Sequence, residues 1–326
     1  RGRKYSHIEL KNDDGTVNWE KAYRVLSSKQ VVEDIERIRE DLFKDRPNTK
    51  ILIYGRSGGG YLAQEYLAKY SQHVEKAFIG AAANPVIRRQ LGYIESKYFY
   101  NTLAAIDTTL HQKLQVILDR NIVPEYQLLW MLNRIPYRSQ NPGDELSNLI
   151  NELYEGKSDL YEEYLQKQMF DFAALQILEE KMNGWQIGLR LRQVEFGSEN
   201  LFAPKYEYID PLSTCLLKLS EPFLKLIKEQ KVDLPVDISL DALMEVETEV
   251  FYLAGKNDHV VPYQIGIELG NYFKNYELFI ADDNHNMTIY DECYPLLRSA
   301  FFQYGIHSKE LEKARNSLKC NEWKPE

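Results

Sequence analysis

The chain has 326 residues, of which 44% are hydrophobic and 27% are charged, and its formal net charge is −9. These fractions are typical of a globular protein and exclude the collagen-like, disordered and disulfide-scaffold classes. The acidic excess has the wrong sign for binding nucleic acid through its phosphates, and no stretch approaches the ~18 apolar residues of a membrane span. The three cysteines lack C-x-x-C spacing, and no H-E-x-x-H or EF-hand pattern occurs, so we expect no metal site.

The first predicted elements are a helix and a buried strand. Residues 28–44 show helical periodicity, and the apolar side chains on one face are Val31, Ile35, Ile38 and Leu42. Residues 50–54 then form a short apolar run without polar alternation. That pattern predicts a strand buried on both faces, as in a parallel sheet.

The rest of the chain predicts a split α/β domain. A glycine-rich turn at residues 55–60 precedes a second amphipathic helix, which is followed by a strand-like run. Helical stripes then dominate, and the stretch 144–180 alone carries ten acidic residues against two lysines. Strand and helix signals resume near residue 250. We therefore predict a mostly parallel sheet flanked by helices, with core segments 1–85 and 244–326 and an all-helical lid at 86–243.

The turn Gly55-Arg56-Ser57-Gly58-Gly59 matches the pattern G-x-S-x-G. A serine on a tight strand-to-helix turn needs glycine on each side, because larger side chains would collide with the neighbouring backbone. The Gly58 N–H, at the start of the helix, is the predicted oxyanion donor. A phosphate loop is disfavoured because no Lys-Ser or Lys-Thr follows these glycines. The remaining alternative to a nucleophile is a structural serine in a glycine-rich turn.

A serine nucleophile needs a base, and the base needs an acid that orients it. His285 follows the last predicted strand, and Asp258 follows the strand before it. Open α/β sheets bind their ligands at this end of the strands, and the order Ser57, Asp258, His285 is that of a hydrolase triad on such a sheet. Asp282 and Asp283 are alternative acids, but we expect them to be solvated loop carboxylates.

With these motifs in place, the sequence resembles the α/β-hydrolase superfamily and, more narrowly, the prolyl aminopeptidase (proline iminopeptidase, S33-type) family of serine peptidases. The likeness rests on the opening residues 1–6, the helix segment 32–39, the elbow at Ser57 and the loops of Asp258 and His285. It implies that Ser57 is the nucleophile, His285 the general base and then acid, and Asp258 the residue that orients it. No cofactor is implied.

The sequence departs from this family at three points. Gly58 stands where the family has Trp, and Asn284 stands where it has Gly before the catalytic histidine. The first strands of the fold and the His-Gly-rich loop that supplies a second oxyanion donor are absent. Since a sheet that began here would expose an unpaired strand, we expect an upstream segment, from a longer precursor or a companion chain.

Three functions stay open at this point. The first is an aminopeptidase that removes N-terminal residues from peptides, with Glu195 and Glu199 as candidates for binding the free ammonium group. The second is a carboxylesterase or lipase-like enzyme with the same triad, and the third is a non-catalytic binding protein on a hydrolase scaffold. The expected partner is a small peptide or ester, with neither nucleic acid nor a membrane span, and the expected location is cytoplasmic.

Overall fold

A computed structural model describes residues 10–92, 101, 103–139, 141–167, 184–202, 211–258, 260–287, 293–317 and 322–325. It contains two compact units, which are considered separately below. One comprises Arg1–Ser27 and Ile94–Pro235, and the other comprises Ser28–Tyr93 and Val236–Glu326. The sequence grouped residues 1–85 in one core segment, whereas in the structure the contacts divide at Ser27. A lid role for the helical unit stays a prediction.

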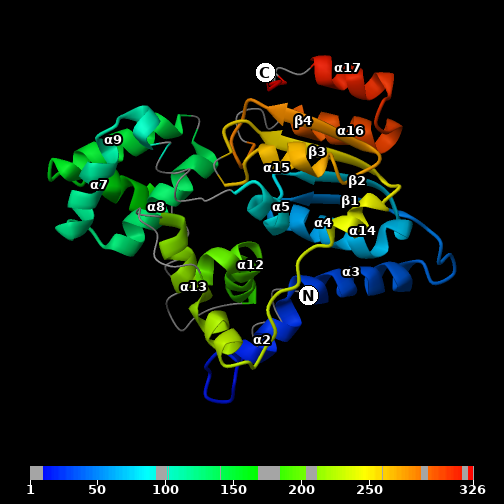
Figure 1. Cartoon of the computed structure of the whole chain (residues 1–326), viewed down its shortest axis with the longest axis horizontal. Coiled ribbons are helices and arrows are strands. Elements are labelled where there is room, and N and C mark those ends of the chain that lie inside the picture. The colour runs from blue at the N-terminus through cyan, green and yellow to red at the C-terminus, as the bar shows by residue number, and fades with distance from the viewer. Residues whose placement is uncertain are drawn as a thin grey trace. The chain divides into compact units, whose positions relative to one another are not determined.

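The second unit is built on a parallel sheet (Figure 1). Its strands lie in the order β1-β2-β3-β4, and all three pairings are parallel. The strand bounds are β1 Ile51–Arg56, β2 Val74–Gly80, β3 Glu249–Gly255 and β4 Tyr276–Ala281. Helix α4 (Gly58–Tyr70) and the short η1 (Ser71–His73) connect β1 to β2, and α15 (Gln264–Leu269) lies between β3 and β4. The predicted parallel α/β fold class is confirmed.

Helices cover both faces of this sheet (Figure 1). Helix α4 packs on one face, with α3 (Ser28–Leu42) against its outer side, and α16 (Cys293–Tyr304) covers the other, followed by α17 (Lys309–Ser317). The core on the α16 side is aromatic: the ring centroid of Phe251 lies 5.1 Å from that of Phe78 and 5.6 Å from that of Phe301. Two shorter helices, α5 (Pro85–Gln90) and α14 (Leu240–Met244), complete the described part of this unit.

The prediction that the first strand is buried on both faces is wrong. Leu52 and Tyr54 of β1 are each 50% exposed. The reason is that β1 ends the strand order, and the described residues supply no strand on its outer side. At the opposite edge, by contrast, Trp323 donates its backbone N–H to the carbonyl of Ile280 in β4. That an upstream segment or companion chain pairs with β1 stays a prediction.

Helix α3 confirms a predicted element but not its buried face. Ile38 and Leu42 of the apolar stripe are 58% and 69% exposed. The buried positions of this helix include Glu36 and Arg39, which are not part of the predicted apolar stripe. Burial is possible because these two charges neutralise each other, with Arg39 Nη2 2.8 Å from Glu36 Oε1.

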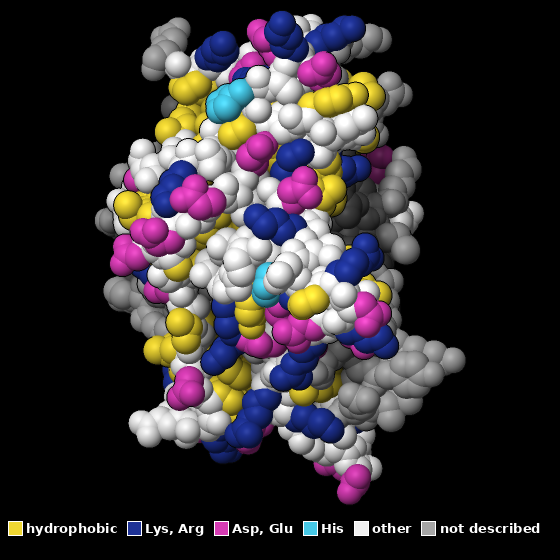
Figure 2. Space-filling model, turned by 90° about the vertical axis from the view of Figure 1, so that its right-hand side faces the viewer, with side chains coloured by type: hydrophobic (Ala, Val, Ile, Leu, Met, Phe, Trp, Pro, Cys, Tyr) yellow, Lys and Arg dark blue, Asp and Glu magenta, His cyan; other side chains and the backbone are white. Residues whose placement is uncertain are grey.

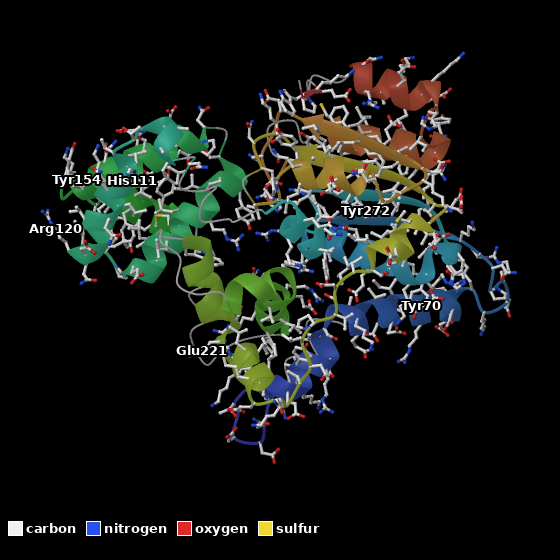
Figure 3. All side chains as sticks on the ribbon, viewed as in Figure 1. Tyr70, His111, Arg120, Tyr154, Glu221 and Tyr272 are labelled. Atoms are coloured by element: carbon white, nitrogen blue, oxygen red, sulfur yellow. The ribbon has the colours of Figure 1, made fainter. Side chains whose placement is uncertain are left out.

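Glu36 is the centre of a polar cluster that joins α3 to α4. The Tyr66 hydroxyl donates to Glu36 Oε2 at 2.5 Å, and His73 Nδ1 lies 2.8 Å from Oε1. On the outside of the same interface, Glu33 binds Lys69 and Tyr70, the latter labelled in Figure 3. Burial opposes the charge of Glu36, but the hydrogen bonds from Arg39 and Tyr66 outweigh it and hold the pKa of this carboxyl below its ordinary 4.5.

Replacing Glu36 by Gln is expected to lower the free energy of unfolding by about 3 kcal/mol, because it leaves the guanidinium of Arg39 buried without a counter-charge. Since folding lowers the pKa of Glu36, its contribution is complete above pH 4.5 and is lost as the pH falls through the folded-state value. Urea titrations at several pH values should therefore show that the free energy of unfolding falls less toward acid pH in E36Q than in the parent chain. The control is Glu33→Gln in the same helix, which removes a partly exposed pair worth at most ~1 kcal/mol. Equal losses in the two variants would contradict this account.

In the first unit the described elements are helical apart from one isolated bridge, between Lys11 and Val17. They share one apolar core, in which the ring of Trp19 meets that of Phe223 edge-on at 5.3 Å. The helices are α2 Trp19–Leu26, α7 Leu110–Asp119, α8 Glu125–Arg138, α9 Pro142–Tyr154, α10 Asp159–Lys167, α12 Gly184–Phe202 and α13 Pro211–Lys228.

On the face shown in Figure 2, both acidic and basic side chains are exposed, with hydrophobic side chains between some of them. The end of the acidic stretch predicted at 144–180 lies outside the described residues, from 168 onward. Throughout the described ranges, no helix has both the length and the apolar character that crossing a bilayer requires.

Candidate active site

Ser57 lies on a strained turn between β1 and α4. Its backbone has φ 52° and ψ −123°, a conformation that residues other than glycine rarely adopt. Three hydrogen bonds hold it there. The Ser57 N–H donates to the carbonyl of Gly80 at 2.8 Å, and its own carbonyl accepts from the N–H groups of Gly60 and Tyr61. The side chain makes no capping bond to the helix, so the hydroxyl is available to other partners.

Two glycines make this turn possible, but they are not the two that the motif names. A Cβ at Gly55 would lie 2.3 Å from the carbonyl oxygen of Gly59, and a Cβ at Gly60 would lie 2.4 Å from Cβ of Ala82. A Cβ at Gly59 would meet nothing within 4 Å. The expectation that glycine is needed on both sides of Ser57 is therefore right for Gly55 and wrong for Gly59, because the crowded backbone lies one residue later.

We expect Gly55→Ala to lower the free energy of unfolding by about 3 kcal/mol, since its methyl group would overlap backbone atoms that cannot move aside without distorting the turn. Gly59→Ala, the matched control in the same turn, should be neutral or slightly stabilising because alanine favours the helix that begins there. Urea unfolding of the two variants checks this. Similar stabilities for both would show that the crowding at Gly55 is not real.

The structure brings the three predicted triad residues together within the sheet unit. His285, in the loop after β4, has Nε2 3.0 Å from Oγ of Ser57. Its other ring nitrogen, Nδ1, lies 2.8 Å from Oδ2 of Asp258, in the loop after β3. Both contacts are satisfied by one tautomer, in which Nδ1–H donates to the carboxylate and Nε2 accepts from the serine hydroxyl.

The three triad residues differ in how far they are exposed to solvent. Asp258 and His285 are 1% and 2% exposed, whereas Ser57 is half-buried and so reachable by a ligand. Oδ1 of Asp258 accepts the backbone N–H groups of Val260 and Val261 at 2.9 and 2.8 Å. These bonds fix the carboxylate rotamer, so that the remaining oxygen faces the imidazole.

Gly58 takes the position predicted for an oxyanion donor. It is the first residue of α4, and an N–H in the first turn of a helix has no acceptor within that helix. The partial positive charge of the helix N-terminus adds to the attraction for a negatively charged oxygen. The role of this N–H as an oxyanion donor stays a prediction.

The sequence analysis missed the contacts of Asp283 and Arg56 around the histidine loop. Asp283, expected to be a solvated carboxylate, is fully buried and accepts the Tyr294 hydroxyl at 2.5 Å and the Asn284 N–H at 2.7 Å. Arg56 donates to the carbonyl of His285 at 3.2 Å. No sequence signal marks Asp283, since the run Asp282-Asp283-Asn284 is typical of an exposed turn, and the neighbour Tyr294 is supplied by α16.

Neither glutamate suggested for ammonium binding is shown to be free. Glu195, in α12 of the helical unit, is buried and forms an ion pair with Arg192, so its charge is already matched. Burial, together with the charges of Glu195 and Asp233, raises the pKa of Tyr23 to about 12. The side chain of Glu199 lies outside what the structure describes.

Within the described residues no group of three or more His, Cys, Asp or Glu side chains could hold a metal ion.

Residues 18–149 match the family model described as serine aminopeptidase, S33. The parallel sheet and the strained Ser57 elbow are what that family's fold requires. This chain has the α/β-hydrolase fold and resembles the S33 family. The matched segment covers less than half of the chain, and it contains Ser57 but ends before Asp258 and His285.

Solved structures similar to this chain include three hydrolases. An esterase from Exiguobacterium antarcticum is 14% identical, with 86% of this chain and 74% of that chain covered and a TM-score of 0.40. The meta-cleavage product hydrolase of Pseudomonas fluorescens IP01 is 17% identical, with 85% and 72% covered and a TM-score of 0.39. An α/β-fold hydrolase of Bacillus anthracis is 19% identical, with 84% and 72% covered and a TM-score of 0.37. No curated protein sequence matches this chain.

Proposed function

We propose that this protein is a serine hydrolase that works through an acyl-enzyme on Ser57. The observation that supports the proposal most directly is the pair of contacts at His285, 3.0 Å to Ser57 and 2.8 Å to Asp258. A hydroxyl that donates to a buried, oriented imidazole is an activated nucleophile. The same contacts speak against a non-catalytic scaffold.

In the proposed reaction, Oγ of Ser57 attacks the substrate carbonyl carbon while His285 Nε2 takes the hydroxyl proton. The Gly58 N–H stabilises the negative oxygen of the tetrahedral intermediate. The bond to the leaving amine or alcohol then breaks, and the leaving group takes the proton from Nε2. Water repeats the sequence on the acyl-enzyme, giving its proton to His285, and releases the acid and free Ser57. Asp258 stabilises the imidazolium through both halves.

For the substrate class, we propose removal of N-terminal residues from peptides, supported by the S33 family match. The alternative is an esterase, because the contacts of His285 with Ser57 and Asp258 serve ester hydrolysis equally well. The two candidates share the triad and differ in whether the substrate needs a free amine.

A fluorophosphonate probe tests the catalytic proposal, because it reacts with activated serines. The expected result is one label on Ser57, absent in Ser57→Ala and retained in Ser71→Ala, a control at the far end of α4. A chain that folds but takes no label would overturn the proposal.

Substrate class is tested with aminoacyl p-nitroanilides, their N-acetylated analogues and p-nitrophenyl esters of simple acids. An aminopeptidase should cleave the anilides and lose this activity on N-acetylation, since the ammonium group is what it recognises. Cleavage of esters alone, with no effect of an amine, would reject the aminopeptidase and support the esterase.

A further inference from the structure

We propose that Arg56 is a positioning residue that holds the His285 loop against the nucleophile turn. The inference rests on the proposed function, since it concerns how Ser57 and His285 are kept at reacting distance. Arg56 occupies the variable position before the serine in the G-x-S-x-G motif, and nothing in that motif requires an arginine there.

The side chain of Arg56 reaches from the end of β1 to the histidine loop. Its Nη2 lies 3.2 Å from the carbonyl oxygen of His285 and 3.5 Å from Oδ1 of Asn286. On the way it crosses β2 at Gly80: a Cβ built on Gly80 would lie 3.5 to 3.9 Å from the carbon atoms of the Arg56 stem. The stem therefore lies beside Gly80 of β2, and the guanidinium reaches the histidine loop.

Such a link matters because the Asp258 and His285 loops are bonded to each other, whereas the Ser57 turn follows a strand that is not adjacent to theirs. The Asp258 and His285 loops follow the adjacent strands β3 and β4, and a backbone hydrogen bond joins them, from the Asn257 N–H to the carbonyl of Asp283 at 3.0 Å. Ser57 follows β1, which β2 separates from both of those strands. The Arg56 guanidinium provides a direct bond from the elbow to the backbone of the residue that must accept the serine proton.

Proton transfer depends steeply on this distance, and a misplacement of about 1 Å in a catalytic group costs on the order of 100-fold in rate. Loss of Arg56 should therefore reduce the rate of Ser57 acylation by between about 10-fold and 100-fold. KM should stay unchanged, because the guanidinium is bonded to the protein's own loop.

The experiment compares Arg56→Gln with Arg298→Gln, an arginine of α16 that stacks on the Tyr54 ring of the same strand at 4.3 Å. Fluorophosphonate labelling rates and p-nitrophenyl acetate kinetics are measured with the melting temperature of each variant. The expected result is a fall in labelling rate and kcat of about 10-fold or more in R56Q, at constant KM, while R298Q labels like the parent chain.

Labelling of R56Q within twofold of the parent rate would overturn the inference, as would an equal loss in R298Q or a change confined to KM. Arg56→Lys restores a cationic donor, and its kcat should lie between those of R56Q and the parent. If R56Q does not fold, R56K is compared with R298Q by the same criteria. Failure of the parent chain to label overturns the proposed function instead, so the two outcomes are distinct.

Discussion

Ser57→Ala is expected to lower kcat for an activated ester on the order of 10⁴- to 10⁶-fold, because no other group in the proposed mechanism can form the acyl-enzyme. His285→Ala should fall in the same range, since the serine hydroxyl then has no base at 3.0 Å. The two residues act as a unit, so the double variant should lose no more than either single one. The measurement is steady-state hydrolysis of p-nitrophenyl acetate.

The free energy of unfolding of Ser57→Ala distinguishes a loss of catalysis from a loss of folding. Removing the Ser57 hydroxyl leaves the backbone bond from Ser57 to Gly80 in place, so the free energy of unfolding should change by less than about 1 kcal/mol. Ser71→Ala serves again as the serine control and should keep full activity. A Ser57→Ala protein with more than a hundredth of the parent kcat would show that the nucleophile lies elsewhere.

Asp258→Asn is expected to lower kcat by about 10⁴-fold with little change in fold. The amide oxygen of asparagine can still accept from the N–H groups of Val260 and Val261. Its amide nitrogen then faces Nδ1 of His285 and donates to it, which stabilises the tautomer protonated on Nε2. An imidazole in that form cannot accept the proton of Ser57.

Asp282→Asn is the matched control for this substitution. The Asp282 side chain is 45% exposed in the loop that carries His285, so it tests for a general effect of removing a carboxylate nearby. Its kcat should stay within twofold of the parent value. The same large loss in both variants, or in neither, would reject the role of Asp258.

The placement of the triad could be predicted from local patterns. The G-x-S-x-G run follows a strand and precedes a helix, and Asp258 and His285 each follow a strand of the same parallel sheet. Because parallel strands bring their carboxyl ends to one edge, three such loops meet there whatever separates them along the chain. The order of strands in the sheet thus explains why three residues far apart in the sequence lie close together in the structure.

The burial of particular side chains could not be predicted in this way. The apolar stripe of α3 indicated its inward face, yet Leu42 is exposed and Glu36 is buried. Helical periodicity describes a single helix, whereas the face that becomes buried depends on the side chains of the elements that pack against it. Here that partner is Tyr66 of α4, whose hydroxyl donates a hydrogen bond to the carboxylate of Glu36.

By itself the sequence determined the parallel sheet, the serine on its turn and the order of the acid and base loops, because these depend on residue types and spacings along short segments. The tertiary structure alone decided that Gly60 rather than Gly59 is crowded, that Asp283 is buried against Tyr294, and that Arg56 reaches the His285 loop. The physical reason is that steric overlap and hydrogen bonding between distant segments are set by distances in space, which residue spacing does not encode.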